Sequence, residues 1–213
     1  MKFATAILAF AGAANAAKSF IDFSNGMYTI PIVNGTLDLD SATRDAEHGS
    51  NINTTLAALS SPQLIDMAAG GMPGLCVPQF PTRKTYCRTR HVPRADYLRA
   101  LARFLDWIET GPDEGWVPKH SCKALVWGEA VVSACTTRGP NPTCRDELVE
   151  AMRELDVFCA LDLGGDIKVS RWAKRYARHH VRDSLDTDVV VGALAADDEE
   201  GEGQGQEEWQ GQN

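Results

Sequence analysis

The stretch from Ser121 to Trp172 constrains the fold most, because it holds four of the six cysteines and most of the patterned apolar residues. Its cysteines are Cys122, Cys135, Cys144 and Cys159. Several cysteines close together, among short segments with strand and helix patterns, are typical of a domain that disulfides hold together, which we call stapled. The stretch therefore predicts a disulfide-bonded α+β unit.

A helix is expected to begin at Cys144, with Thr143 as its cap and carboxylates in its first turn. Its apolar positions recur at helical spacing: Leu148, Ala151, Met152, Leu155, Phe158 and Cys159. Residues 123–137 have β-branched residues that favour strands and alanines that tolerate a helix; we take them as strand-rich, with Gly128-Glu129 as a hairpin turn. Gly164-Gly165 predicts a turn, followed by a short strand at Ile167–Val169.

The first 17 residues have the composition of a cleavable export signal, with a lysine, an apolar run and small residues at the end. The mature chain would then start near Lys18 and be secreted without a transmembrane segment. In an oxidising compartment six cysteines predict three disulfides. We expect a local Cys76–Cys87 bridge, and loop lengths suggest Cys122–Cys159 with Cys135–Cys144. Cysteine and histidine spacing does not fit a metal site, and no cofactor is expected.

The expected fold is α+β, a small antiparallel sheet packed against two or three helices and stapled by three disulfides. Residues 18–59 would form an N-terminal hairpin and polar loop, with residues 40–59 either loop or part of a pro-segment. Residues 60–196 would form the stapled domain. Of the 29 acidic residues ten follow Arg182, where no lysine or arginine occurs. Residues 197–213 are therefore expected to be a disordered acidic tail.

Asn34-Gly35 between two short apolar runs is the preferred two-residue hairpin turn. It predicts a β-ribbon over residues 30–39, in which Ile32 faces Leu37 and Ile30 faces Leu39. Pro31 places this ribbon at a sheet edge. Asn34 and Asn53 each begin a glycosylation sequon.

Two helices are expected before the stapled unit. Ser61-Pro62 starts a short one that Gly70-Gly71 ends. Residues 72–93, which contain four prolines, are expected to form an irregular loop. The stronger one covers Arg94–Thr110, where apolar residues repeat at helical spacing up to Gly111-Pro112. Residues 83–103 carry seven cations and only Asp96 as an acid, a pattern that fits either a solvated face or an anion site.

A last helix is expected from Arg171 to Arg182, with its cations on one face. They are Arg171, Lys174, Arg175, Arg178 and Arg182. Like charges one helical turn apart repel, so this face is predicted to bind an anionic partner. The acidic tail could cover it at low salt, or be a solubilising segment that touches nothing.

Signals for catalysis are few. Six paired cysteines leave no thiol nucleophile, and the serine-hydrolase motif G-x-S-x-G does not occur. His120 and Glu129 are the one candidate pair for acid–base chemistry of ribonuclease type. A histidine in a loop also fits a solvated or structural role.

From Cys135 onward the chain resembles small secreted fungal proteins in its layout. A cysteine strand is followed by the helix RDELVEAMRELDVFC, a glycine turn and the strand DIKV. This order is similar to that of smut-fungus killer toxins and of necrosis-inducing effectors of plant pathogens. The resemblance implies a compact α/β sandwich that acts on other cells without being an enzyme, and it transfers no functional residue.

Two hypotheses follow. The first is a secreted, non-enzymatic fungal effector or toxin-like virulence protein, a monomer that binds a host or competitor surface protein or an anionic ligand. It would have no specific nucleic-acid partner. The alternative is a secreted ribonuclease-type hydrolase that uses His120 and Glu129.

Overall fold

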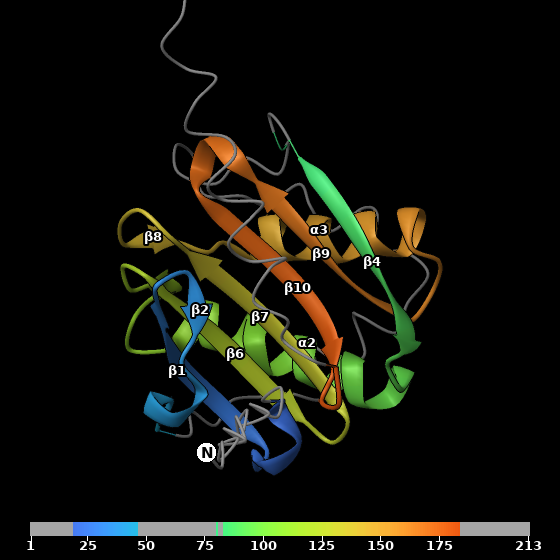
Figure 1. Ribbon diagram of the computed structural model, residues 1–213, viewed down its shortest axis with the longest axis horizontal. Coiled ribbons are helices and arrows are strands. Elements are labelled where there is room, and N and C mark those ends of the chain that lie inside the picture. The colour runs from blue at the N-terminus through green and yellow to red at the C-terminus, as the bar shows by residue number, and fades with distance from the viewer. Residues whose placement is uncertain (1–18, 47–79, 81–82, 184–213) are drawn as a thin grey trace, which may run out of the picture.

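The structure, a computed structural model, describes residues 19–46, 80 and 83–183. Figure 1 shows one curled sheet with two helices on one of its faces. The sheet contains β1 (Gly26–Val33), β2 (Thr36–Leu37), β3 (Thr43–Arg44), β4 (Lys84–His91), β6 (Ser121–Trp127), β7 (Ala130–Thr136), β9 (Leu163–Val169) and β10 (Lys174–His180). The helices are α2 (Arg94–Thr110) and α3 (Arg145–Phe158). Short elements complete the fold: the 3-10 turns η1 (Phe20–Asp22), η2 (Leu39–Ser41) and η4 (Ser170–Trp172), and the strand pair β5 (Trp116–Val117) and β8 (Asn141–Pro142).

The strand order is β2-β1-β6-β7-β10-β9-β4, with β3 beside β1, and every pairing is antiparallel. The expected small sheet with two or three helices and three disulfides is therefore wrong. Eight strands form a half-barrel, with two helices and with two disulfides that join described residues. The sheet is larger than expected because residues 84–91 and 174–180, taken as loop and helix, are both strands.

The β1–β2 ribbon confirms two parts of the hairpin prediction, the two-residue turn and the residue pair next to it. Asn34 and Gly35 have φ values of 52° and 76°, and Ile32 lies opposite Leu37. The ribbon also lies at one edge of the sheet. The pairing of Ile30 with Leu39 is wrong, because the chain turns into η2 after Asp38, whose side chain accepts a hydrogen bond from the Ser41 N–H.

The predictions for residues 94–158 hold in most respects. Helix α2 has the predicted bounds, and β6 and β7 form the strand-rich hairpin around Gly128, whose φ is 56°. Helix α3 starts one residue later than expected, since Cys144 is its N-cap residue and Thr143 precedes the cap.

The glycine pair predicted as a turn lies inside strand β9 instead. Gly165 pairs with Cys87 of β4 and with Arg178 of β10. A Cβ atom at Gly165 would lie 2.8 Å from a Leu155 methyl group, so glycine here permits the close approach of α3 to the sheet.

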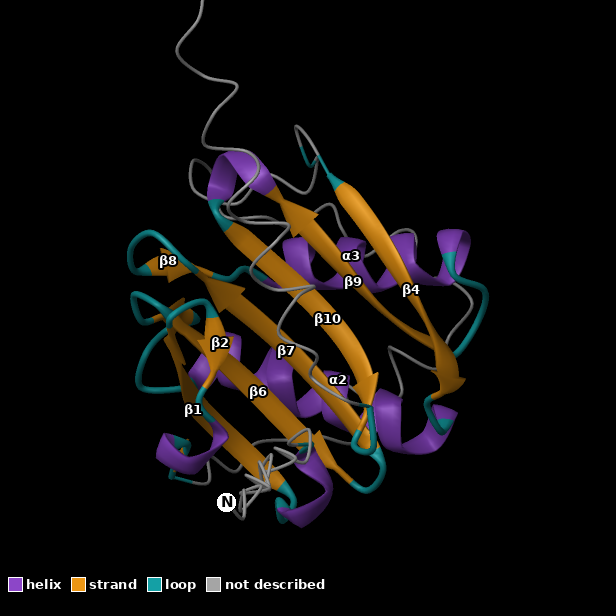
Figure 2. Cartoon of the chain, viewed as in Figure 1, coloured by secondary structure: helices purple, strands orange, loops and turns teal. Residues whose placement is uncertain are grey.

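The predicted helix at Arg171–Arg182 is wrong: residues 174–180 form the strand β10 (Figure 2). β10 pairs along its length with β7 on one side and with β9 on the other. In a strand alternate side chains point to opposite faces, so Tyr176 packs in the main core and Ala177 lies on the other face of the sheet. Pairing of this segment with a strand on each side outweighs the helical spacing of its residues in the sequence.

Two apolar cores lie on the two faces of the sheet. The larger one fills the space under α2 and α3 and includes Phe104, Leu105, Leu148, Leu155 and Ile167, which are all fully buried. The smaller one lies on the opposite face over β1, β6 and β7, and η1 contributes Phe20 to it. The central strands are therefore buried on both sides.

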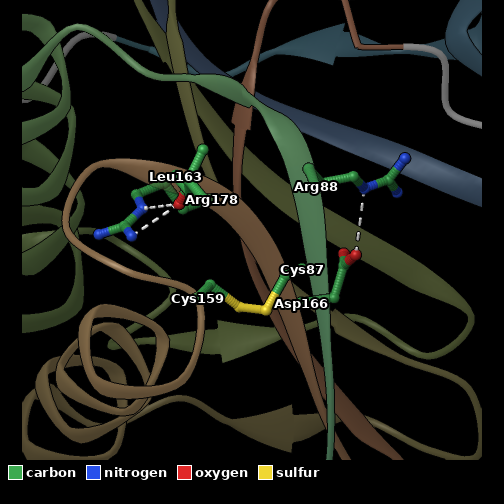
Figure 3. Close-up of a disulfide and its surroundings, with 6 residues drawn as sticks. All are labelled: Cys87, Arg88, Cys159, Leu163, Asp166 and Arg178. Carbon is green, nitrogen blue, oxygen red and sulfur yellow. Dashed lines mark hydrogen bonds and ion pairs between the residues drawn. A yellow bond between two sulfur atoms is a disulfide. The ribbon is translucent and has the colours of Figure 1, made fainter.

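The cysteine pairing differs from the prediction. Cys87 of β4 is bonded to Cys159 at the end of α3, and Cys122 is bonded to Cys135, its directly opposite partner in the β6–β7 hairpin (Figure 3 shows the first). The Cys76–Cys87, Cys122–Cys159 and Cys135–Cys144 bridges are all wrong, because loop lengths carry no information about strands that meet through the sheet. Cys144 is also disulfide-bonded.

Several expectations lie outside the described residues. They are the export signal, Lys18, the loop after residue 46 with Asn53, the helix at Ser61, Cys76 and the acidic tail. In the part of the chain that the structure describes, no helix is long and apolar enough to span a membrane.

The two disulfides close loops of very different length, with sequence separations of 72 and 13 residues. In the chain-entropy description the longer loop restricts the unfolded chain more. Replacing both Cys87 and Cys159 by serine should therefore lower the free energy of unfolding by about 4 kcal/mol, against about 3 kcal/mol for Cys122 and Cys135. Urea denaturation measures both losses. A larger loss for the Cys122/Cys135 variant would contradict this ranking.

Candidate functional site

The five cations predicted to share one helix face are divided by strand β10. Lys174 and Arg178 point toward the helices, whereas Arg175 points to the opposite face. Arg171 and Arg182 are exposed near the two ends of the strand. The predicted basic face therefore does not exist as one surface.

Lys174 belongs to a buried network under α3. Its ammonium group lies 2.7 Å from the Glu147 carboxylate and donates to the Pro142 carbonyl, and the Tyr176 hydroxyl donates to the same carboxylate. Burial lowers the pKa of Lys174, and the charge of Glu147 opposes this shift. Burial and Glu147 together raise the pKa of Tyr176. Lys174 holds α3 on the sheet and is not available to a partner.

Arg178 is fully buried and also has a structural role. Its guanidinium donates to Asp156 at 2.7 Å and twice to the Leu163 carbonyl, at 3.0 and 2.7 Å (Figure 3 shows the latter two). It lies 4.7 Å from the Tyr97 ring centre. Burial raises the pKa of Tyr97 to about 12, although Arg178 acts against this shift. Arg178 connects β10, α2 and α3.

A group of cations that reach the surface lies on β4, a strand at one edge of the sheet, and on the residue before it. We call Arg83, Lys84, Arg88 and Arg90 the basic edge. Each of its arginines is held by one carboxylate from another element. The three pairs are Arg83–Glu154 at 2.9 Å, Arg88–Asp166 at 3.4 Å and Arg90–Asp183 at 3.2 Å.

In each of these pairs the cation is the exposed member. The side-chain exposures are 37% and 8% for Arg83–Glu154, 19% and 1% for Arg88–Asp166, and 51% and 9% for Arg90–Asp183. The basic edge therefore presents oriented positive charge outward, above carboxylates that lie beneath it.

Asp166 is the centre of this arrangement. It is completely buried, and it faces Arg88, Arg175 at 2.8 Å and His179 at 3.3 Å. Burial alone would raise the pKa of Asp166, but the charge and hydrogen bond of His179, with the charges of Arg175 and Arg88, hold it well below its ordinary value. The carboxylate is therefore ionised across the physiological pH range.

A second feature adds positive charge beside Asp166. Lys84, Lys168 and Arg175 occupy directly opposite positions on β4, β9 and β10, so their side chains share one face of the sheet. Like charges at such positions repel, and they raise the local positive potential at this edge. Lys84, Lys168 and Arg175 each also make further contacts, so this row is not a set of unpaired charges.

His120 and Glu129, the candidate acid–base pair, are not brought together. His120 precedes β6 and Glu129 follows it in the hairpin turn, so the length of the strand, about 20 Å or more, separates them. Glu129 lies 3.7 Å from His180 instead. The two residues cannot share a proton-transfer site.

Asn34, a predicted glycan acceptor, is exposed at the tip of the β1–β2 hairpin.

Sequence reasoning missed β4 and its carboxylate partners. The segment KTYCRTRH has cations at alternating positions, Arg88 and Arg90, which is the signal of a strand. The nearby prolines favoured a loop interpretation. No sequence signal connects Arg88 to Asp166, which lies 78 residues away along the chain.

Comparisons with protein-family models, with curated proteins and with solved structures find no match to this chain.

Replacing Asp166 by asparagine should destabilise the fold by about 3–5 kcal/mol near neutral pH, because the buried cations around it lose their counter-charge. The lowered pKa of Asp166 means that the ionised carboxylate stabilises the fold above the unfolded-state pKa of about 3.9, and that this contribution is lost as the pH falls below it. The difference between wild type and variant should therefore shrink in acid. Urea denaturation at a series of pH values measures it; a difference that does not change with pH would contradict the assignment.

Proposed function

We propose that this chain is a secreted binding protein that docks its basic edge on an anionic target at the surface of a host or competitor cell. It would act as a fungal effector or toxin-like protein, through binding and not through catalysis. The observation that carries this proposal is the set of three arginines on β4 and just before it, each more exposed than the buried carboxylate that holds it. The layout resemblance to fungal toxins and effectors supports the class of protein.

The ion pairs favour this use of the edge because they orient the arginines before a partner arrives. A guanidinium already held by a carboxylate loses less side-chain freedom on binding than a mobile one. Arginine also recognises carboxylate, sulfate and phosphate groups through paired N–H donors. The basic edge is thus a preorganised row of anion-binding groups.

The position of these charges also decides how a partner can approach. An edge strand has backbone groups that could pair with another strand, and charged side chains on it discourage that pairing. A partner therefore meets the side chains of Lys84, Arg88 and Arg90 and not the backbone of β4. We infer a docking mode that is ionic and sensitive to salt.

The covalent structure supports the proposed location. Disulfides such as Cys87–Cys159 and Cys122–Cys135 are typical of proteins that leave the cytosol. They agree with the export-type composition of the first 17 residues. Secretion would place the basic edge where it meets the anionic groups of other cells.

Replacing both Lys84 and Arg90 by glutamine should make the protein elute from immobilised heparin at lower salt, because two exposed cations of the basic edge are removed. The matched control replaces Arg99 on α2 and Lys119 before β6, which are both exposed, and should elute as wild type does. Thermal unfolding of both variants checks that they fold. Equal elution of the two double variants would refute the role of the edge.

The acidic C-terminal segment is expected to compete for the same edge. Residues 197–213 contain acidic residues and no lysine or arginine. Thirteen residues separate this segment from Asp183, which is itself paired with Arg90. Truncation after Ala196 should therefore raise the salt concentration of elution from heparin, and the gain should be smaller when Lys84 and Arg90 are glutamine. If the truncated and full-length chains elute together, the segment does not cover the basic edge.

A further inference from the structure

A second site lies near the opposite edge of the sheet from β4. A cavity of about 430 Å³ separates α2 from the ends of β1 and β6. Pockets for small molecules usually have volumes of about 300–1,000 Å³ and combine apolar walls with a few polar groups. This cavity has both the size and the mixed lining, and the basic edge does not contribute to it.

The apolar wall consists of Met27, Trp107, Leu125 and Trp127. Met27, Trp107 and Leu125 belong to the main core and are almost fully buried, so they form a fixed surface. Trp127 packs against that core and is partly exposed. Indole rings offer large flat surfaces to an aromatic or apolar ligand.

Two arginines line the same cavity, and each is held in place. The Arg103 guanidinium lies 4.1 Å from the centre of the Trp127 ring, which is a cation–π contact. Arg44 donates a hydrogen bond of 2.7 Å to the Asn25 carbonyl. Asp106 is the only carboxylate among the described lining residues, and Arg44 and Asp106 each make a further contact. Arg103 forms no ion pair with a described carboxylate and brings positive charge to the cavity.

Gly26 explains how Arg44 reaches this position. A Cβ atom at residue 26 would lie 2.6 Å from the Arg44 Nε atom, and the φ of Gly26 is +156°. Only glycine lets the guanidinium lie against the backbone of β1. The placement of Arg44 is thus built into the backbone of the hairpin region.

We propose that this cavity binds a small organic anion with an aromatic or apolar body. The anionic group would accept hydrogen bonds from Arg44 and Arg103, and the body would lie against Trp107 and Leu125. A cationic ligand is disfavoured by the Arg103 guanidinium, and a neutral apolar ligand would make no hydrogen bond to it. This inference does not depend on the function proposed for the basic edge.

The probe for this site is 1-naphthaleneacetate, and 1-naphthaleneacetamide is its uncharged counterpart. A hydrogen bond to a charged group contributes about 1.5–3 kcal/mol, so the carboxylate should bind about tenfold or more tightly than the amide. Isothermal titration calorimetry with the full chain measures both dissociation constants. Equal affinities, or binding of neither probe, would overturn the proposal.

Variants then locate the site. Arg103→Gln should weaken naphthaleneacetate about tenfold and leave the amide nearly unchanged, whereas Arg103→Lys should keep part of the preference for the acid. The matched control is Arg99→Gln, one turn earlier on α2 and outside the cavity lining, which should bind as wild type. Arg44→Gln gives an independent test from a different element if Arg103→Gln fails to fold.

If Arg103→Gln and Arg44→Gln both bind the acid as tightly as the Arg99→Gln control, the cavity is not the site and the proposal is wrong. The heparin-binding variant with Lys84 and Arg90 replaced should retain full affinity for naphthaleneacetate. Loss of heparin binding with retained probe binding therefore separates the basic edge from this cavity.

Discussion

The fold depends on strand β10 being buried between β7 and β9 while it carries three cations. A buried charge without a partner is very unfavourable, so each of these side chains requires a carboxylate close by. Glu147 and Asp156 on α3 satisfy Lys174 and Arg178, and Asp166 on β9 satisfies Arg175. The same ion pairs therefore set both the order of the strands and the position of α3.

The two disulfides stabilise different parts of the fold. Cys122–Cys135 fastens the central hairpin, and Cys87–Cys159 ties the edge strand β4 to the end of α3. The second bond matters for the proposed function, because an edge strand has a neighbour on one side only. With β4 fixed, Arg83 and Arg88 remain close to the carboxylates of Glu154 and Asp166, which belong to α3 and β9.

The two proposed sites lie near opposite edges of one sheet, and they would bind their ligands through different interactions. The basic edge offers exposed, oriented charge to a large anionic surface, and its contacts weaken as salt screens them. The cavity beside α2 encloses a ligand against indole rings, where electrostatic contacts are stronger because less water is present. The chain can therefore hold a small organic anion without occupying the surface proposed for its larger target.

The sequence by itself determined the elements with strong local signals. The Asn34-Gly35 turn, helix Arg94–Thr110 and the hairpin around Gly128 follow from turn chemistry and periodicity, which act between near neighbours. The tertiary structure alone decided that β10 is a strand, that Cys87 pairs with Cys159, and that the cations of β4 lie above buried acids. Each of these depends on residues far apart in the chain, whose meeting follows from strand order and not from any local pattern.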